Sequence, residues 1–128
     1  MRIFFNDVLK KIQESHLIIC RSGASTIAEL TSIGRPSILI PYPYSVDEHQ
    51  MKNAMALDDC GAGWLIPEQS FTSDALSKKL ESCLKLPKTL ARAADCAKAI
   101  GKPHATEAFA DLVCNALNYN CEFCLERN

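Results

Sequence analysis

The chain has 128 residues, 48% of them hydrophobic and 23% charged, with a formal net charge of −1 at pH 7. That length suits one domain and is too short for two ordinary ones. The near-neutral charge and the lack of a basic stripe exclude nucleic-acid binding driven by phosphate contacts, and no apolar run reaches the roughly 18 residues of a transmembrane segment.

The N-terminal residues predict the end of a strand followed by a short helix. Residues 2–5 form an apolar run, and Asn6 or Asp7 is suited to cap a helix. The inward positions of this helix are expected to be Val8, Leu9 and Ile12. Because a parallel strand needs neighbours, this beginning suggests that earlier strands of the same sheet are missing.

A second strand and helix follow. Residues 17–20 are apolar and rich in β-branched side chains, which is typical of a strand buried on both faces. Ile27, Leu30 and Ile33 recur at helical spacing, and Gly34 ends the pattern. Residues 21–26, which are small apart from Arg21, join the strand to the helix.

This strand–turn–helix allows two interpretations. The start of a helix directs free backbone N–H groups and a positive dipole end to one place, which can hold a phosphate. Thr26 and Glu29 also match a capping box, in which side chains satisfy those N–H groups and no ligand is needed. The local pattern does not choose between them, because no glycine-rich nucleotide fingerprint occurs in the chain.

The next strand completes a βαβ unit with the strand and helix just described. Residues 37–41 predict a buried strand that ends at Pro41, and residues 42–48 form a loop with two tyrosines and two carboxylates. A helix is expected to begin at His49-Gln50, to bury Leu57 and to end near Cys60-Gly61. Ligands of open α/β sheets bind at the carboxyl ends of the strands, where this loop lies.

The remaining chain predicts one more strand and three helices. Residues 63–66 form the strand, and Thr72 to Asp74 cap a helix that ends before Pro87. The expected inner face of that helix is Leu76, Leu80 and Leu84. Helices over 87–100 and about 105–117 complete a domain assigned to residues 1–117, with a tail over 118–128.

Seven cysteines are scattered through these elements and predict reduced, buried thiols. The Met1 to Phe5 start is too short for a signal peptide, so we expect a cytoplasmic chain. Cys121 and Cys124 could form half of a zinc site or a redox pair, but no second such pair or suitably spaced histidine occurs. No metal or cofactor is predicted.

Several motifs in order carry a family resemblance. They are Arg21-Ser22-Gly23-Ala24-Ser25-Thr26-x-x-Glu29-Leu30, Gly34-x-Pro36, Ile40-Pro41-x-Pro43, Asp47-x-His49-Gln50-x-x-Asn53-Ala54 and Gly61-Ala62. Over about residues 4–106 the chain resembles the donor half of the MurG family, which transfers N-acetylglucosamine from UDP to a lipid-linked muramoyl-pentapeptide in peptidoglycan synthesis, a step in bacterial wall biogenesis, cell shape and division. The resemblance implies an α/β fold, a Rossmann-like parallel sheet with flanking helices, as part of the C-terminal domain of a GT-B glycosyltransferase.

The resemblance also implies donor-binding residues. Phe5 matches the residue whose backbone pairs with uracil, and Glu29 matches the carboxylate that binds the ribose hydroxyls. The diphosphate is held at positions matching Ala24, Ser25 and Thr26, and the sugar at positions matching His49 and Gln50. Arg21 is a weaker candidate that could approach the phosphates or tie down the turn. Tyr42 and Tyr44 are expected to be packing residues at the cleft rim.

The family's N-terminal domain, with its acceptor site and catalytic base, is not among these residues, and we assign no catalytic residue here. The first hypothesis is therefore the UDP-N-acetylglucosamine-binding part of an inverting transferase, inactive without the acceptor domain, which acts at the cytoplasmic face of the inner membrane when full-length. A second is a stand-alone donor subunit of a two-chain enzyme, similar to the eukaryotic one, with residues 118–128 as a docking element. A third is a fragment that folds poorly, because exposed sheet edges favour aggregation.

Overall fold

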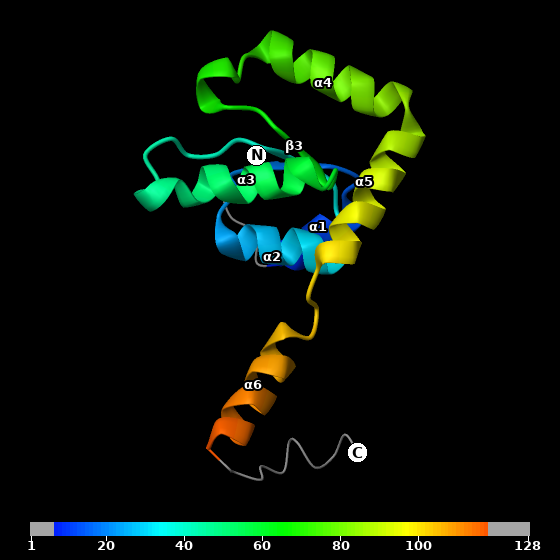
Figure 1. The fold of residues 1–128 in the computed structure, drawn as a ribbon. Helices are drawn as coiled ribbons and strands as arrows, with labels where there is room; N and C mark the ends of the chain where they lie inside the picture. Colours follow the sequence, from blue (N-terminus) through cyan, green and yellow to red (C-terminus); the bar gives the residue numbers. More distant parts are fainter. Residues whose placement is uncertain (1–6, 118–128) are drawn as a thin grey trace.

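The computed structural model describes residues 7–117 (Figure 1). The strand predicted over residues 2–5 and the tail over 118–128 lie outside the described residues, as do Phe5 and the Cys121–Cys124 pair.

A three-stranded parallel sheet forms the centre of the fold. Its strands are β1 (Ile18–Cys20), β2 (Ser37–Leu39) and β3 (Gly63–Leu65), in the spatial order β1-β2-β3. Ile19 lies opposite Ile38, which in turn lies opposite Trp64. All three strands lie within predicted segments, and their parallel pairing confirms the predicted α/β class.

Helices connect and flank the strands. They are α1 (Val8–Glu14), α2 (Ala24–Ile33), α3 (His49–Asp59), α4 (Ser73–Lys85), α5 (Pro87–Ile100) and α6 (Ala105–Ala116), with short 3₁₀ turns at Val46–Glu48 and Glu68–Ser70. Two predicted caps are confirmed. The Asp7 carboxylate accepts from the Lys10 N–H at 2.9 Å, and the Thr72 hydroxyl accepts from the Ala75 N–H at 3.2 Å.

The sheet is covered on both faces by separate hydrophobic clusters. On one face the side chains of α2, α3 and α5 pack against β2; the fully buried members are Leu30, Leu39, Ala54, Ala62 and Ala97. On the other face α4 packs through Leu76 and Leu80 against Ile38, Ile40 and Ile66. This alternation of neighbouring strand residues between two apolar cores explains why the strand sequences lack polar side chains at most positions.

Three expected inward positions are wrong. Val8 and Leu9 are 51% and 49% exposed, because α1 packs through Ile12 and is covered on one side only. In α4, Leu84 is 69% exposed, whereas the neighbouring Cys83 is 1% exposed and takes the inward place. Apolar residues next to each other on a helix compete for the same face, and tertiary packing selected the smaller one.

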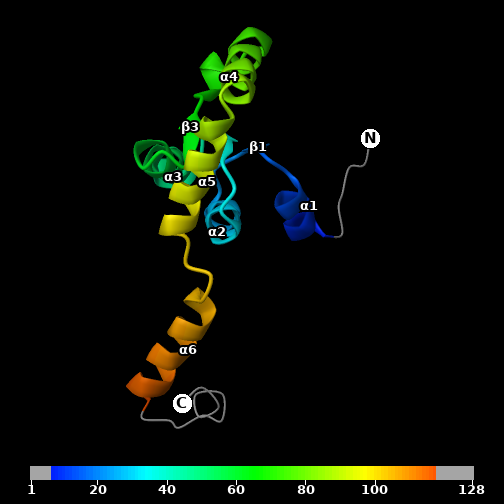
Figure 2. The same ribbon diagram turned by 90° about the vertical axis from the view of Figure 1, so that its right-hand side faces the viewer.

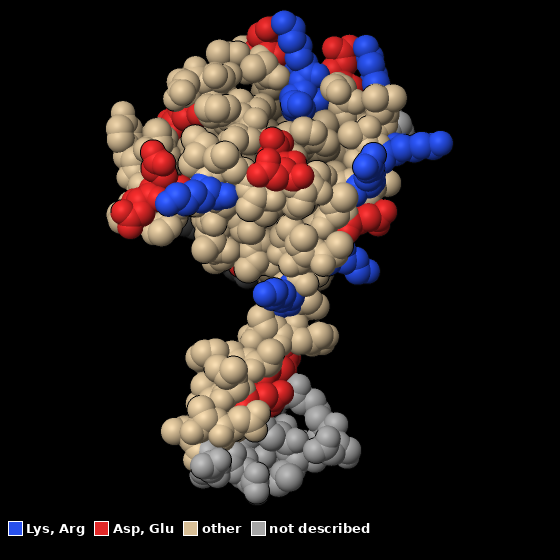
Figure 3. All heavy atoms as spheres, viewed as in Figure 1, with Lys and Arg blue, Asp and Glu red and all other residues tan. Residues whose placement is uncertain are grey.

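Helix α6 stands away from the rest of the described chain in both ribbon views (Figures 1 and 2). Its apolar residues are largely exposed, including Phe109 at 67% and Leu112 at 66%. Figure 3 shows Lys and Arg interspersed with Asp and Glu on the viewed face of the body, without a stripe of one sign. None of the described helices is long and apolar enough to cross a membrane.

Candidate functional site

Helix α2 begins with an open N-terminus. Gly23 is the N-cap and supplies no side chain, and the first helical hydrogen bond runs from the Ile27 N–H to the Gly23 carbonyl at 3.0 Å. The N–H groups of Ala24, Ser25 and Thr26 therefore donate to no group in the described part of the chain. Three unsatisfied donors at the positive end of a ten-residue helix are suited to an anion.

The capping-box interpretation of this stretch is wrong. Thr26 is the third residue of α2 and not its N-cap, so its hydroxyl does not close the first turn. The helix starts earlier than a threonine cap would allow because glycine is itself an acceptable N-cap residue. Glu29 consequently lies in the second turn, with its carboxylate free of hydrogen bonds and ion pairs to described residues.

Helix α3 begins beside this site after a strained turn. Asp47 and Glu48 have φ values of 49° and 56°, a left-handed conformation that is uncommon for residues other than glycine. His49 follows with a largely exposed side chain, and its Nε2 lies 3.7 Å from an Asp47 carboxylate oxygen. Two adjacent left-handed residues turn the loop sharply, so that α3 begins at His49 itself.

Gln50 is held by the loop that precedes it. Its side-chain oxygen accepts from the Tyr42 N–H at 2.9 Å, and its own N–H donates to the Ser45 hydroxyl at 3.4 Å. The acceptor end of the Gln50 amide is therefore occupied, while its NH₂ group donates to no described residue. This orientation leaves hydrogen-bond donors available at the start of α3.

The structure brings most of the sequence-predicted residues to one edge of the sheet. The starts of α2 and α3 follow the carboxyl ends of β1 and β2, and the Ser22 hydroxyl before α2 donates to the Gln50 carbonyl at 2.7 Å. Glu29 lies apart, one turn along α2. It lines a cavity of about 350 Å³ formed with Leu9 and Gln13 of α1 and the segment after α5.

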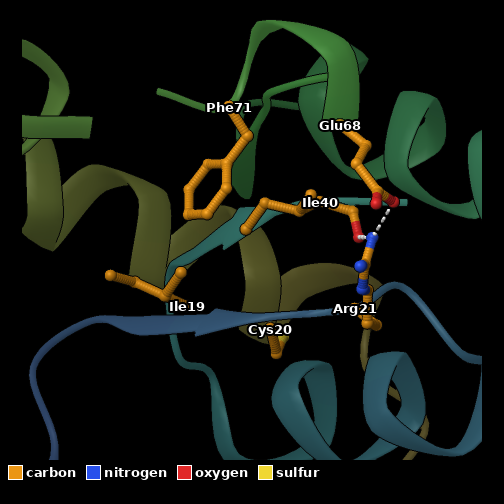
Figure 4. Close-up of a pocket in the computed structure, with 6 residues that line it drawn as sticks. All are labelled: Ile19, Cys20, Arg21, Ile40, Glu68 and Phe71. Atoms are coloured by element: carbon orange, nitrogen blue, oxygen red, sulfur yellow. Dashed lines mark hydrogen bonds and ion pairs between the residues drawn. The ribbon is translucent and has the colours of Figure 1, made fainter. Parts of the chain in front are cut away.

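Arg21 is fixed by protein groups. Its guanidinium forms an ion pair with Glu68 at 2.6 Å and donates to the carbonyls of Ile40 and Pro41, each at 3.3 Å. Figure 4 shows this pair at one end of a cavity of about 520 Å³ whose other walls include the apolar Ile19 and Phe71. Of the two predicted roles of Arg21, the structure supports tying down the turn. Glu68 could not be found from sequence, because its partner lies 47 residues away.

The two loop tyrosines contact each other. The ring centroids of Tyr42 and Tyr44 lie 5.7 Å apart in an edge-to-face arrangement, and the Arg21 guanidinium lies 5.7 Å from the Tyr42 ring. Tyr42 makes both contacts but is still 45% exposed, and Tyr44 is 83% exposed, so the prediction that Tyr44 is a packing residue is wrong. Aromatic surface at this rim is suited to contact a ligand or another chain.

Four cysteines of the central body, Cys20, Cys60, Cys83 and Cys96, are free thiols that are buried or partly buried. Burial raises the pKa of the Cys20 thiol at the end of β1 to about 11. Burial also raises the pKa of Cys83, an effect that nearby Lys79 partly offsets. Among residues 7–117 no group of three or more potential metal ligands is present.

Cys20 is expected to resist alkylation in the folded protein. At about pH 8 its thiol stays protonated, so iodoacetamide should modify it far more slowly than in the same chain unfolded in urea, as measured by mass spectrometry of the labelled peptides. Because the pKa is higher in the folded state than its ordinary value of 9.0, the stability linked to this thiol is present below pH 9 and is lost as the pH rises towards 11. Equal labelling in both states would contradict this assignment.

Comparisons with known proteins agree on one family. A sequence model described as "Glycosyltransferase family 28 C-terminal domain" matches residues 2–113. The chain is 53% identical over 110 residues to the UDP-N-acetylglucosamine--N-acetylmuramyl-(pentapeptide) pyrophosphoryl-undecaprenol N-acetylglucosamine transferase of Paramagnetospirillum magneticum. It is 47% identical over 110 residues to the protein of the same name from Rhodospirillum rubrum.

The shape comparison agrees. The crystal structure of Acinetobacter baumannii MurG matches with a TM-score of 0.77 and 35% sequence identity, over 85% of this chain and 31% of that one. The two curated relatives are matched over 86% of this chain but only 30% and 28% of their own lengths. The chain thus corresponds to less than a third of these relatives, and the resemblance drawn from its motifs is confirmed.

Proposed function

From the premise that this chain belongs to the glycosyltransferase family 28 C-terminal domain family, we propose that it is the donor-binding part of an inverting N-acetylglucosaminyltransferase. Its donor is UDP-N-acetylglucosamine, and its acceptor is a lipid-linked muramoyl-pentapeptide. The names of the relatives support this substrate pair. The observation that carries the proposal is the uncapped start of α2, which offers three free N–H groups beside the start of α3.

The proposed donor lies along the carboxyl edge of the sheet. The diphosphate accepts from the N–H groups of Ala24, Ser25 and Thr26, which meet its charge without a metal ion. The sugar hydroxyls contact His49 and Gln50 at the start of α3, where the Gln50 NH₂ group is available. The ribose hydroxyls donate to Glu29, and the proposed partner of the uracil is Phe5, which lies outside the described residues.

In the proposed reaction the acceptor hydroxyl displaces UDP directly at the anomeric carbon, with inversion. This domain binds the donor and stabilises the departing diphosphate, since backbone donors placed at developing negative charge lower the barrier. The acceptor site and the catalytic base come from an acceptor domain in a longer chain. Relatives in which this region makes up about 30% of one longer chain favour this arrangement over a separate donor subunit. The full-length enzyme works at the cytoplasmic face of the inner membrane.

Binding of the donor tests the proposal. Titration of the chain with UDP-N-acetylglucosamine in a calorimeter is expected to give saturable heat with weak affinity, in the range of about 10 μM to 1 mM. Uridine diphosphate is expected to bind at least about tenfold more tightly than cytidine diphosphate, which carries the same diphosphate on a different base. A folded chain, verified by circular dichroism, that binds neither ligand or both equally would contradict the assignment of a uridine nucleotide donor.

A further inference from the structure

Ser22 and Asn53 lie outside the proposed donor contacts and join the diphosphate-binding half of the proposed site to its sugar-binding half. Ser22 lies in the turn between β1 and α2 and is fully buried, with 0% of its surface exposed. Its hydroxyl donates to the Gln50 carbonyl at 2.7 Å, and its own carbonyl accepts from the Asn53 side-chain NH₂ at 3.0 Å. Each segment thus contributes one side chain and one backbone carbonyl to the pair of bonds, which we call the Ser22–Asn53 clasp.

The clasp connects segments that are distant in sequence and adjacent in the site. Its two bonds span 28 and 31 residues, from the turn that starts α2 to the first turns of α3. The loop before α3, which contains two left-handed residues, holds Gln50 by an exposed bond from Tyr42 and a longer bond of 3.4 Å to Ser45. The clasp bonds are shorter, at 2.7 and 3.0 Å, and both involve the fully buried Ser22, so competing water has less access to them and the clasp is the more rigid connection.

We infer that Ser22 and Asn53 are positioning residues that set the place of the sugar-binding pair relative to the diphosphate-binding turn. This inference rests on the proposed function. The clasp contacts neither the N–H groups proposed to bind the diphosphate nor the side chains of His49 and Gln50. It acts through two backbone positions. The Ser22 backbone leads into α2, and the Gln50 backbone carries one of the side chains proposed to bind the sugar. In enzymes a misplacement of about 1 Å between the groups of a site can cost about two orders of magnitude in reaction rate, so the relative position of the two halves matters.

A purely structural role makes a different prediction. If the clasp only stabilises the fold, its loss lowers the melting temperature but leaves the ligand preference of the folded fraction unchanged. If it positions the sugar pair, its loss reduces discrimination between sugars more than affinity for the diphosphate. UDP-N-acetylglucosamine and UDP-N-acetylgalactosamine carry the same charge and differ in one hydroxyl configuration, so the ratio of their affinities reports the sugar half alone.

Two variants remove one bond each. Asn53→Asp keeps the side-chain shape but replaces the NH₂ donor with an oxygen that repels the Ser22 carbonyl, and Ser22→Ala removes the hydroxyl. Calorimetry below the melting temperature is expected to show that each variant lowers the preference for the glucosamine donor by about fivefold or more, while affinity for UDP changes less than about twofold. Ser22→Ala is the smaller change and serves if Asn53→Asp does not fold.

Ser37→Ala is the matched control. Ser37 is also fully buried, but it lies at the amino end of β2 and its hydroxyl forms no hydrogen bond among the described residues. Its removal is expected to leave both affinities and their ratio unchanged. The role of the clasp would be overturned if both clasp variants bind like the wild type with an unchanged ratio of affinities for the two UDP sugars. It would also be overturned if the wild type shows no preference between the two sugars. Either result would leave the proposed function standing. A wild-type chain that binds no uridine nucleotide would overturn the proposed function and the role of the clasp together.

Discussion

Replacing Glu29 with alanine is expected to abolish detectable binding of UDP-N-acetylglucosamine. The carboxylate is the proposed acceptor for both ribose hydroxyls, and a hydrogen bond to a charged group contributes about 1.5–3 kcal/mol. Losing two such bonds corresponds to a fall in affinity of roughly a hundredfold or more, which puts a weak ligand beyond calorimetric detection. Calorimetric titration of the variant beside the wild-type chain measures this loss directly.

The fold offers no competing explanation for such a loss. The Glu29 carboxylate forms no hydrogen bond or ion pair with any described residue, so alanine removes no internal partner. Glutamate is also half-buried there beside a cavity of about 350 Å³, which a smaller side chain leaves open. The melting temperature of the variant is therefore expected to stay close to that of the wild type.

Glu81→Ala is the matched control for Glu29→Ala. Glu81 is an exposed residue of α4 that pairs with Lys85, and α4 packs against the sheet face opposite α2. The same change of charge and size there is expected to leave donor affinity within about twofold, because an exposed ion pair contributes little. Unchanged affinity in a folded Glu29→Ala protein would show that Glu29 does not bind the donor. The diphosphate-binding role of the uncapped start of α2 would then stand without an assigned ribose-binding residue.

Gly101→Ala is expected to lower the stability of the fold strongly, although it adds a single methyl group. Gly101 follows α5 and lies against the backbone of α2. A Cβ atom added to it would overlap the Thr31 carbonyl oxygen and would lie 2.7 Å from the Thr31 carbonyl carbon. Because these are backbone atoms at the buried end of α2, next to Leu30, relief requires α5 to move away from α2 and opens the core that both helices share.

Overpacking of this kind costs about 1–3 kcal/mol, and the backbone contact places Gly101→Ala at the upper end. In a domain of this size that corresponds to a fall in melting temperature of roughly 10 °C, measurable by circular dichroism. Lys102→Ala, at the next and exposed position, is the control and is expected to change stability by less than about 0.5 kcal/mol. A Gly101→Ala protein as stable as the wild type would show that α5 ends differently.

Local sequence signals predicted the elements well. The β-branched run at 17–20, the proline after 37–40 and the caps at Asp7 and Thr72 depend on neighbouring residues only, and all lie where the structure has the corresponding element. Inward faces were less predictable. Leu84 and Cys83 fit one helical pattern almost equally, and contact with the rest of the fold decided between them.

The candidate site also combines features that the sequence predicts with features that depend on tertiary contacts. Order and spacing of short motifs predicted which residues gather at the carboxyl edge of the sheet, because a βαβ unit brings the ends of consecutive strands together whatever the intervening helix contains. The resemblance to the MurG family followed from the same motifs and is confirmed. The roles of Phe5, Ala24, Ser25, Thr26, Glu29, His49 and Gln50 stay predictions.

Three features of the site depended on contacts that no local pattern encodes. The capping box was wrong because the backbone turns helical at Ala24, which leaves Thr26 inside the helix and its N–H group open. Arg21 is occupied by Glu68, and Ser22 is joined to Asn53, through bonds that span 47 and 31 residues. Amino-acid order determined the strands, the helices and the edge where a ligand can bind, because these follow from periodicity and chain connection. Only the tertiary structure decided which polar groups form hydrogen bonds within the protein and which remain free to bind a donor, because a hydrogen bond depends on the positions of both partners in space.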